Sequence, residues 1–448
     1  MSFPRYPDYK HSGVEWLGEL PAHWTVRRLK QVVDPRRQIT YGIVQAGPHI
    51  ADGIPYIRPA DMTDEQGVLA ADELMRTSPE IAGCYTRSTI CTGDLVCSIG
   101  PSFGKVMVTP DWLDSANLTQ GTARIAVQQP NDARYVFWTL RSRTSFGQWE
   151  SSVGGATFRA LNLGPLAETI IPVPDGPEQT QIAAFLDRET AKIDELVAEQ
   201  RRLMELLKEK RQAVISHAVT KGLNPDAPMK PSGIEWLGDI PEHWSTGQSR
   251  RLFALRNERA LDSDKQLTAS QEHGVIYQEE FIRLEGRRVV QVIKGADILK
   301  HVEPNDFVIS MRSFQGGIEW CNLRGCISSA YVMLIPSRQI NAPFFSYLLK
   351  SRSYIQALQT TSNLVRDGQA LRYDNFTQVD LPIVPVVEQQ LIADFLDQET
   401  KKIDELVIEA QRAINLLQER RTALISAAVT GQIDIRALSQ TKELEAAA

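Results

Sequence analysis

The chain carries two copies of one sequence pattern, and this repeat limits the folds that it can adopt. Residues 12–24 read SGVEWLGELPAHW, and residues 232–244 read SGIEWLGDIPEHW. A longer pair follows these boxes: residues 178–220 match residues 388–430 at roughly 27 of 43 positions, well beyond a coincidence of composition. The order is therefore box, variable region and long helical segment, repeated once. A chain built in this way is expected to fold into two similar halves.

The two variable regions share a faint pattern but differ in most residues. Short apolar runs such as 95–99 and 331–335 alternate with Gly, Asp, Asn and Pro, a pattern typical of short strands separated by turns. Helices are expected near residues 132–145 and 342–358. The predicted class is α+β, with two tandem mixed α/β domains whose scaffolds match and whose surfaces differ. The expected segments are 1–176, a first globular domain; 177–222, a central helix and linker; 223–386, a second globular domain; 387–436, a C-terminal helix; and 437–448, a flexible tail.

The repeated segments 178–219 and 388–429 contain neither Gly nor Pro and are rich in Leu, Ala, Glu, Lys and Arg. Apolar residues recur at every seventh position over about five heptads, with Gln200 as a polar break in the first copy, and this spacing is typical of a coiled coil. Leu196, Leu406 and Ala413 form a neighbouring row. The predicted coiled-coil core consists of Leu186, Ile193, Leu207, Val214, Leu396, Ile403, Ala410, Leu417 and Leu424.

Helices of this length cannot bury their apolar stripes on a domain of ordinary size, so we expect the two helices to pair with each other. The alternative is an amphipathic helix that packs on its own domain. Each helix leaves its globular domain in the same sense, and antiparallel pairing then places the two domains at opposite ends. The expected architecture is an antiparallel coiled coil with an internal pseudo-twofold repeat.

Composition limits the class and the location of the protein. No run of about 18 apolar residues exists that would span a membrane, and the N-terminal residues lack a signal segment. The five Cys show no C-x-x-C pair and are interpreted as reduced thiols, so we expect a cytoplasmic protein. A net charge of −6 argues against wrapping nucleic acid by bulk charge. Any DNA contact must come from basic groups gathered on one face, or from partner subunits.

The SGVEWLGELPAHW box and the EQxxIAxFLDxETxKIDELV segment, each present twice, resemble the DNA specificity subunits of type I restriction–modification systems. The resemblance covers the whole chain in order. It implies that the two globular domains are target recognition domains, each of which reads one half of a bipartite, asymmetric DNA site. It also implies a non-catalytic subunit that selects the sequence for DNA methylation and phage defence.

The same resemblance implies the partners. In that family the helices space the recognition domains and dock two methyltransferase subunits, and two restriction (motor-nuclease) subunits complete the complex. S-adenosylmethionine, ATP and Mg²⁺ are then expected in the partner subunits, and no cofactor is expected in this chain. The near-identical helix surfaces fit this, because two copies of one surface recruit two copies of one partner. The predicted partner-binding residues are Glu178, Gln179, Asp187, Asp194, Glu195, Glu388, Gln389, Asp397, Asp404 and Glu405.

No motif in the chain predicts catalysis. Residues 100–106 (GPSFGKV) differ from a phosphate loop, which has four residues between its glycines and Ser or Thr after the Lys. A strand–loop–strand whose tip faces DNA and a plain surface turn are the two alternatives. Residues 399–401 (ETK) spell a nuclease motif inside a long helix, where a solvated face is the better interpretation. His23 and His243 recur beside Trp in the boxes, which indicates packing or capping. No catalytic residue and no metal site is predicted.

Basic and amide side chains of the variable regions are candidates for reading bases. Arg and Lys bond guanine O6 and N7, and Asn and Gln pair with adenine. A solvated charge or an ordinary turn residue is the alternative for each of them. The DNA-binding candidates are Arg58, Lys105, Asn117, Thr119, Gln120, Arg159, Arg283, Arg287, Arg288, Arg312, Gln315, Arg366 and Arg372.

Three other functions remain open from the sequence. The first is a self-contained methyltransferase or nuclease with an internal repeat, which turnover by the pure chain would reveal. The second is a coiled-coil adaptor that never meets DNA, which a footprint of two separated patches would exclude. The third is the specificity subunit of a modification-only or differently organised restriction or phage-defence methyltransferase system, which the neighbouring genes would decide.

Overall fold

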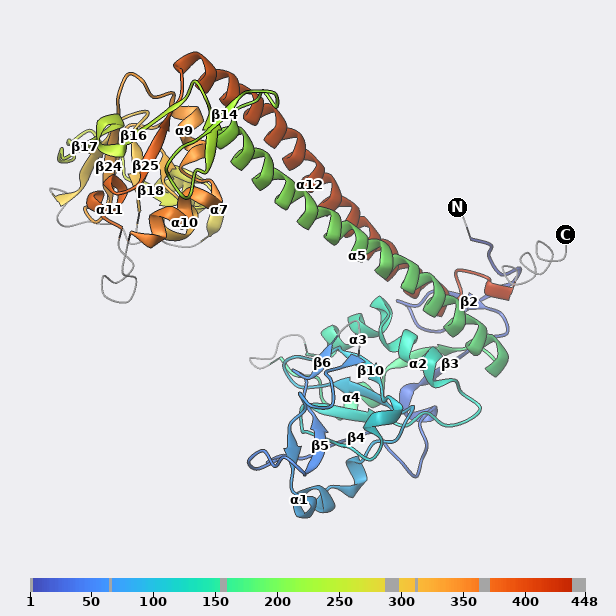
Figure 1. Cartoon of the computed structure of the whole chain (residues 1–448). Coiled ribbons are helices and arrows are strands. Elements are labelled where there is room, and N and C mark those ends of the chain that lie inside the picture. The colour runs from blue at the N-terminus through green and yellow to red at the C-terminus, as the bar shows by residue number, and fades with distance from the viewer. Residues whose placement is uncertain are drawn as a thin grey trace. The chain divides into compact units, whose positions relative to one another are not determined.

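The computed structural model describes residues 3–63, 67–153, 159–286, 298–310, 313–361 and 371–436. The chain forms two compact units (Figure 1): unit 1 holds Met1–Gln200 and Arg412–Ala448, and unit 2 holds Arg201–Gln411. Each unit combines a globular mixed α/β region with one stretch of each long helix, so the predicted class is confirmed. Because the compact units divide both long helices between them, the domain boundaries read from the sequence stay a prediction.

The two long helices are α5 (Gly176–Lys221) and α12 (Val386–Val429). Asp175 begins α5 by accepting the backbone N–H of Glu178 through Oδ1 at 2.9 Å, which is the usual role of an N-cap. Both helices end before a glycine in the left-handed region, Gly222 (φ +75°) and Gly431 (φ +71°). Only a residue without Cβ adopts this conformation readily. The two copies thus share their stop signal.

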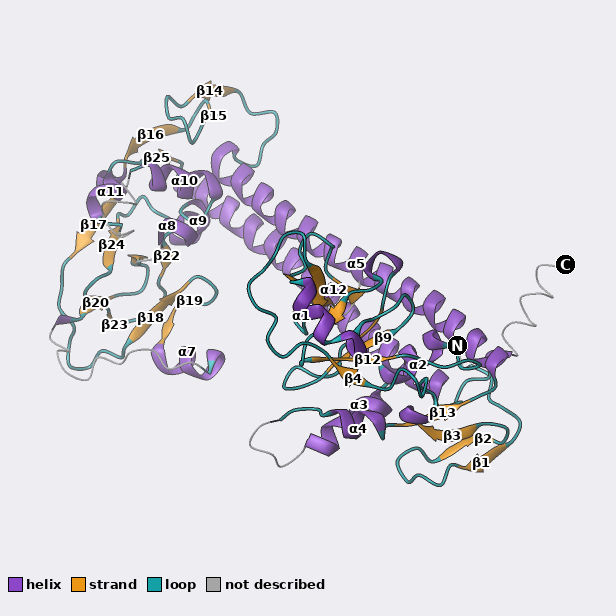
Figure 2. Cartoon of the chain, turned by 90° about the horizontal axis from the view of Figure 1, so that it is seen from below, coloured by secondary structure: helices purple, strands orange, loops and turns teal. Residues whose placement is uncertain are grey.

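Within each unit the two helices run antiparallel and side by side (Figure 2). In unit 1, Asp194 of α5 pairs with Arg421 of α12, with Oδ1 and Nε 2.8 Å apart. In unit 2, Arg211 of α5 pairs with Asp404 of α12 at 3.2 Å. Each residue of the first pair corresponds by the repeat to one residue of the second. The expected antiparallel pairing within each unit and the internal repeat are therefore confirmed.

The heptad stripe lies mostly in the interface between the helices. The core residues Leu186, Ile193, Leu207, Leu396, Ile403, Ala410 and Leu424 are buried, whereas Val214 and Leu417 are half-buried. Two leucines of the neighbouring row lie outside this interface, because Leu196 and Leu406 are 50% and 48% exposed. A two-helix pair buries only one narrow stripe of each helix, so the next row faces outward.

The globular region of unit 1 is built on a four-stranded antiparallel sheet of order β10-β9-β12-β4. Its central strands β9 (Leu95–Ser98) and β12 (Thr122–Ile125) are fully buried; the others are β10 (Val106–Val108) and β4 (Thr40–Tyr41). A three-stranded sheet lies in the same region. It contains β11 (Asn117–Leu118), β5 (Ile54–Ile57) and β8 (Arg76–Thr77).

Three strand pairs and several short helices complete unit 1. The pairs are β1 (Tyr9–His11) with β2 (Glu19–Pro21), β3 (Thr25–Arg28) with β13 (Ile170–Val173), and β6 (Met62–Thr63) with β7 (Gly67–Val68). The helices are α1 (Pro79–Cys84), α2 (Ala133–Leu140), α3 (Arg143–Val153), α4 (Leu163–Ala167) and the 3-10 turns η1 (Leu29–Gln31), η2 (Thr86–Ser88) and η3 (Asp111–Leu113).

Unit 2 repeats this plan with a four-stranded antiparallel sheet of order β17-β24-β21-β22, which matches β4-β12-β9-β10. Its strands are β17 (Phe253–Arg256), β24 (Val332–Pro336), β21 (Phe307–Ile309) and β22 (Glu319–Trp320). The strand pairs are β14 (Met229–Pro231) with β15 (Asp239–Pro241), β16 (Ser245–Gln248) with β25 (Asp380–Ile383), β18 (Leu267–Ser270) with β19 (Gly274–Tyr277), and β20 (Lys300–Val302) with β23 (Gly325–Ile327).

Unit 2 has six short helices in the described residues, and the helix expected near 342–358 is present as two. They are α6 (Ser249–Leu252), α7 (Gln278–Glu285), α8 (Ser313–Gly316), α9 (Ala342–Leu348), α10 (Arg352–Thr360) and α11 (Tyr373–Thr377). In both units the Trp at the end of the box, Trp24 or Trp244, is completely buried. None of the helices in the described ranges has the length and apolar character needed to cross a bilayer.

Candidate nucleic-acid interface and helix junctions

A single glutamate fixes the first box to the start of α5. Nε2 of His23 and Nε1 of Trp24 donate hydrogen bonds to Oε2 of Glu178 at 2.8 and 3.0 Å. The hydroxyl of Tyr6 donates to Oε1 of the same carboxylate at 2.7 Å. Burial, with this bond and the nearby charge, raises the pKa of Tyr6 and keeps its phenol protonated as a donor. Three donors from the N-terminal segment therefore converge on one residue that is 4% exposed.

The second copy repeats this junction. Nε2 of His243 and Nε1 of Trp244 donate to Oε2 of Glu388 at 2.7 and 3.0 Å. The expectation that the box histidines serve packing or capping agrees with both junctions. The position that corresponds to Tyr6 is Asp226 in this copy, and the side chain of Glu388 is 26% exposed. The second junction thus has fewer donors and more contact with solvent.

The glutamine after each of these glutamates supports the next helix of the globular region. Oε1 of Gln179 accepts the backbone N–H of Asp132, the N-cap of α2, at 2.8 Å. Oε1 of Gln389 accepts the backbone N–H of Asn341, the N-cap of α9, at 2.7 Å. Both glutamines are 2% exposed. These bonds tie each long helix to its own globular region.

These contacts correct part of the predicted partner surface. Glu178, Gln179 and Gln389 are buried and Glu388 is half-buried, so their repetition in the sequence reflects a shared internal joint. A side chain whose bonds are used inside the unit cannot present them to another protein. We therefore remove these four residues from the partner-binding candidates.

Asp187 and Asp397 join each long helix to its globular region through an aromatic donor. Nε1 of Trp138 in α2 donates to Oδ1 of Asp187 at 2.8 Å, and the hydroxyl of Tyr347 in α9 donates to Oδ1 of Asp397 at 2.7 Å. Arg134 also pairs with Asp187, at 2.8 Å. Burial raises the pKa of Tyr347 to about 12, so its hydroxyl stays a donor. Asp187 is half-buried and Asp397 is exposed.

The remaining acidic candidates lie on the outside of the helices. Asp194 and Asp404 are exposed but form the interhelical pairs with Arg421 and Arg211. Glu195 and Glu405 are exposed on the same helices. These four side chains remain accessible to a partner.

Four exposed leucines of the long helices recur in both copies, two in each unit. In unit 1 they are Leu196 (50% exposed) and Leu416 (66%), and in unit 2 they are Leu206 (53%) and Leu406 (48%). Leu196 corresponds by the repeat to Leu406, and Leu206 to Leu416. Exposed apolar residues that recur in this way indicate a binding surface more strongly than scattered ones do. The repeat thus gives both units the same exposed pair.

The GPSFGKV segment connects β9 to β10 without a helix. It is therefore a loop between two strands, and contact of its tip with DNA stays a prediction. Nζ of Lys105 donates to the backbone carbonyl of Met62 at 2.7 Å. The ring of Phe103 stacks on Phe146, with centroids 5.7 Å apart. Lys105 thereby holds a neighbouring segment in place. Its ammonium is only partly accessible to a ligand.

The counterpart in unit 2 differs from the expected strand–loop–strand. The segment after β21 contains the short helix α8, which precedes β22. Gln315 is exposed on α8, beside the buried Phe314. The burial of Phe314 explains the difference, because one helical turn puts the aromatic ring into the core and leaves the amide outside.

Two candidates of unit 1 are used by the fold. Asn117 is 1% exposed; its Oδ1 accepts from Oγ of Ser88 at 2.5 Å and from the backbone N–H of Leu118 at 2.8 Å. Asn117 is therefore removed from the base-reading candidates. Arg58 forms a bidentate pair with the buried Asp61, with its shortest contact at 2.6 Å. This bond raises the pKa of Arg58.

The other three candidates of unit 1 are more open. Thr119 is half-buried, and its hydroxyl donates to the carbonyl of Ile57 at 3.1 Å. Gln120 is exposed. Arg159 is 62% exposed and lies 3.5 Å from Glu150. Gln120 and Arg159 are thus the side chains of this group that DNA could reach most freely.

In unit 2 the candidates Arg283 and Arg372 are exposed, and Arg283 lies 3.4 Å from Glu280 on α7. The structure does not bring these two and Gln315 into one cluster. Four candidates lie outside the described residues: Arg287, Arg288, Arg312 and Arg366.

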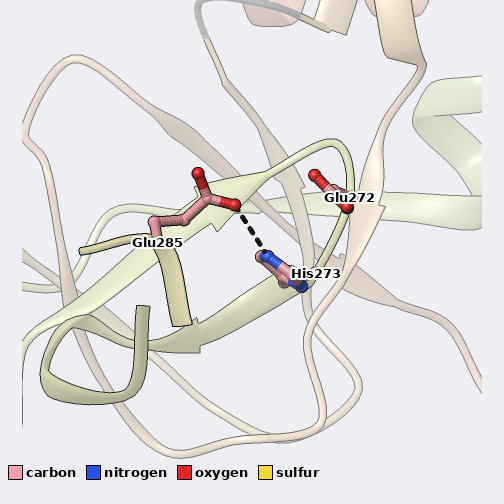
Figure 3. Close-up of side chains that lie close together, drawn as sticks. All are labelled: Glu272, His273 and Glu285. Carbon is pink, nitrogen blue, oxygen red and sulfur yellow. Dashed lines mark hydrogen bonds and ion pairs between the residues drawn. The ribbon is translucent and has the colours of Figure 1, made fainter. Parts of the chain in front are cut away.

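One cluster in unit 2 has the composition of a metal site. Glu272, His273 and Glu285 place one ligand atom each within 4.8 Å of one another. Figure 3 shows His273 directed at Glu285, and their Nε2 and Oε1 atoms are 3.2 Å apart. The ring of His273 also packs edge-on against Phe281. An ion pair that ties the β18–β19 turn to the end of α7 accounts for this geometry.

Residues 21–204 match the family model of the type I restriction modification DNA specificity domain. These residues, called the specificity domain below, are similar to type I specificity domains. The domain includes the last residues of the first box, the first variable region and the start of α5, which are the parts that Glu178, Gln179 and Asp187 hold together. Its boundary in α5 falls near the end of the first compact unit.

Curated specificity subunits are similar to the chain beyond this specificity domain. The EcoBI specificity subunit of Escherichia coli is 25% identical over 55% of this chain, and the match spans only 50% of that subunit. The putative MjaX specificity subunit of Methanocaldococcus jannaschii is 21% identical over 94% of this chain and 96% of its own length.

Solved structures show that the fold extends to both halves. A chain from a study of the assembly and conformational transition of the type I R-M system has a TM-score of 0.68 at 17% identity, covering 92% of this chain and 98% of its own. The HsdS subunit from Thermoanaerobacter tengcongensis has a TM-score of 0.52 at 17% identity, with the same coverages. The specificity domain and its internal copy thus share a known architecture.

Sequence reasoning missed two features of the chain. The exposed leucines were overlooked because heptad analysis looks for buried positions; the signal was their recurrence in both copies. Arg124 was overlooked because it lies in an apolar run, which was interpreted only as a strand. A charged residue within a buried strand is the signal that would have found it.

Proposed function

We propose that the chain is the non-catalytic DNA specificity subunit of a type I restriction–modification complex and that it reads a bipartite, asymmetric site. The observation that carries this proposal is the duplication itself. The two globular regions share their sheet order and their junctions with the long helices, whereas the segments between the strands differ. Two scaffolds with different surfaces suit two different half-sites, and sequence is read by side chains rather than by the fold.

The shared helix surfaces supply the partner contacts in this proposal. Each unit presents the same exposed leucine pair and the same exposed acidic residues, so each would bind one methyltransferase subunit. Two restriction subunits complete the complex. S-adenosylmethionine, ATP and Mg²⁺ would then act in the partner subunits, and this chain would select the DNA sequence.

The proposal is tested by exchanging one recognition region. Residues 223–385 are replaced by the corresponding region of a homologue, the complex is expressed in a host without its own type I system, and the methylated motif is read by methylome sequencing. One half of the motif should change while the other half persists. The reciprocal exchange of residues 1–175 is the matched control and should change the other half. If either exchange alters both halves, independent reading is excluded.

A further inference from the structure

A basic pocket in unit 1 is not explained by the fold. It has a volume of about 700 Å³ and lies between the chain before β4, the η2 turn and strand β12. Four arginines line it: Arg36, Arg37, Arg87 and Arg124. Arg36 and Arg87 are exposed, and neither forms an ion pair with any residue that the structure describes.

Arg124 lies at the base of this pocket and is only 5% exposed. Its Nη1 donates to the carbonyl of Thr89 at 2.7 Å, and its Nη2 lies 3.4 Å from the carbonyl of Gln38. Its Nε is buried without any hydrogen-bond partner. Carbonyl oxygens carry no full charge, so this guanidinium is buried without a carboxylate among the described residues. An uncompensated buried charge costs several kcal/mol in a typical protein.

The nearest carboxylate is already used by another arginine. Nη1 and Nη2 of Arg37 bond Oδ1 and Oδ2 of the buried Asp94 at 2.8 and 2.5 Å. Asp34 contributes a second negative charge nearby, but its carboxylate accepts the backbone N–H of Arg36. Burial and the positive charge of Arg37 lower the pKa of Arg124. The pocket therefore holds more positive than negative charge.

The second copy shows that the fold does not require Arg124. Arg256 pairs with Asp306 in unit 2, with Nε and Oδ2 2.6 Å apart, as Arg37 pairs with Asp94 in unit 1. Arg124 lies opposite Val96 in its sheet, and the residue opposite the corresponding Val308 is Met333. Met333 is completely buried. An apolar side chain fills this position in the corresponding sheet of unit 2, so a sheet of this order forms without an arginine there.

We propose that this pocket binds a phosphate group and that a backbone phosphate of the target DNA is its source. A phosphate in this pocket would neutralise the excess positive charge around the buried Arg124. Arg36 and Arg87 at the surface would then bond its oxygens. The DNA source rests on the proposed function, whereas phosphate binding does not. A phosphate contact would fix the position of unit 1 on the duplex without reading a base.

The test uses the full-length chain with Arg124→Met, which introduces the side chain that unit 2 carries at the same position. Arg27→Met removes an exposed arginine of β3, outside the pocket, and is the matched control. Arg87→Ala is a second pocket variant that leaves the sheet untouched. Each protein is measured for its thermal midpoint with inorganic phosphate against chloride of equal ionic strength. Each is also titrated with a mixed-sequence DNA duplex over a range of salt.

Phosphate should raise the midpoint of the wild type and of Arg27→Met but not of Arg124→Met, and should raise that of Arg87→Ala less. The slope of log affinity against log salt should fall by about one in Arg124→Met. If phosphate stabilises Arg124→Met as much as it stabilises the wild type, the pocket does not bind phosphate. If Arg124→Met loses phosphate binding but its DNA affinity has the same salt slope as the wild type, DNA is not the source of the phosphate. If the wild type binds phosphate but not DNA, the pocket binds phosphate from another source. This result would also count against the proposed function.

Discussion

Nε1 of Trp24 donates a hydrogen bond to Oε2 of Glu178 at 3.0 Å, and this bond closes the joint between the first box and α5. Trp244 makes the same bond to Glu388 at 3.0 Å in the second copy. In each copy the box and the start of the long helix, which are the most strongly repeated segments, are in direct contact. The joints hold each helix to the globular region that it serves.

The joint in unit 1 should contribute more stability than the joint in unit 2. Replacing Glu178 with Ala leaves three donors without their acceptor in a buried site, and we expect a loss of about 2–4 kcal/mol. Glu388→Ala removes the acceptor of two donors at a more exposed site and should cost less. Hydrogen exchange of each globular region during urea titration separates the two effects. Glu205→Ala, at a side chain that is 70% exposed, is the control and should change nothing; an equal effect of Glu178→Ala and Glu388→Ala would contradict the expectation.

The exposed leucines should control how many methyltransferase subunits bind. Leu416→Asp places a charge in the pair of unit 1 and should leave one partner per chain, and Leu206→Asp with Leu416→Asp should leave none. Native mass spectrometry of the co-expressed proteins gives the stoichiometry. Ile408→Asp is a matched control, because Ile408 is also 52% exposed but its counterpart is Ala198. If the double variant still binds two partners, the leucine pairs are not the docking surface.

Unit 2 should lose stability as the pH rises above neutrality. His301 is 2% exposed and lies between two acceptors: Nδ1 is 2.7 Å from Asp264 and Nε2 is 2.8 Å from Glu303. Both ring nitrogens must donate, so the imidazole is protonated. Burial lowers its pKa, but the bonds to the two carboxylates outweigh this effect and raise it.

A raised pKa in the folded state gives stability that is fully present below the unfolded pKa of about 6.5 and is lost as the pH passes the folded pKa. Urea unfolding of unit 2, followed by hydrogen exchange, should show this decline in the wild type. His301→Gln should flatten it, whereas His217→Gln, at an exposed histidine of α5, should retain it. A pH profile that His301→Gln leaves unchanged would show that the ring is neutral in the folded protein.

The five thiols should react in two classes. Cys84 and Cys91 are exposed, whereas Cys97, Cys321 and Cys326 are buried. Burial raises the pKa of Cys97 to about 12 and that of Cys321 to about 11, and the thiolate is the reactive form. Iodoacetamide at neutral pH should therefore label Cys84 and Cys91 first, and the other three only after unfolding. Peptide mass spectrometry identifies the sites, and early labelling of Cys97 would refute the class assignment.

Sequence by itself determined the duplicated plan, the α+β class and the pairing of the two long helices. These features rest on the recurrence of the boxes and on heptad periodicity, which local physics translates directly into amphipathic helices. Leu186, Ile193 and Leu396 could be placed in the helix interface for this reason. Asp194 and Asp404 could be placed on the outside, although not in the ion pairs that they form.

Only the tertiary structure decided the roles of individual polar residues. Glu178 and Gln179 were predicted to bind a partner, but they are the acceptors that join the first box, α2 and α5. Asn117 was predicted to contact a base, but it is buried. Conversely, Arg124 read as part of a strand, yet it lies beneath a basic pocket without a carboxylate of its own. Periodicity tells which face of an element is apolar. Whether a polar side chain meets solvent or another segment depends on residues more than a hundred positions away, and only the folded chain brings these together.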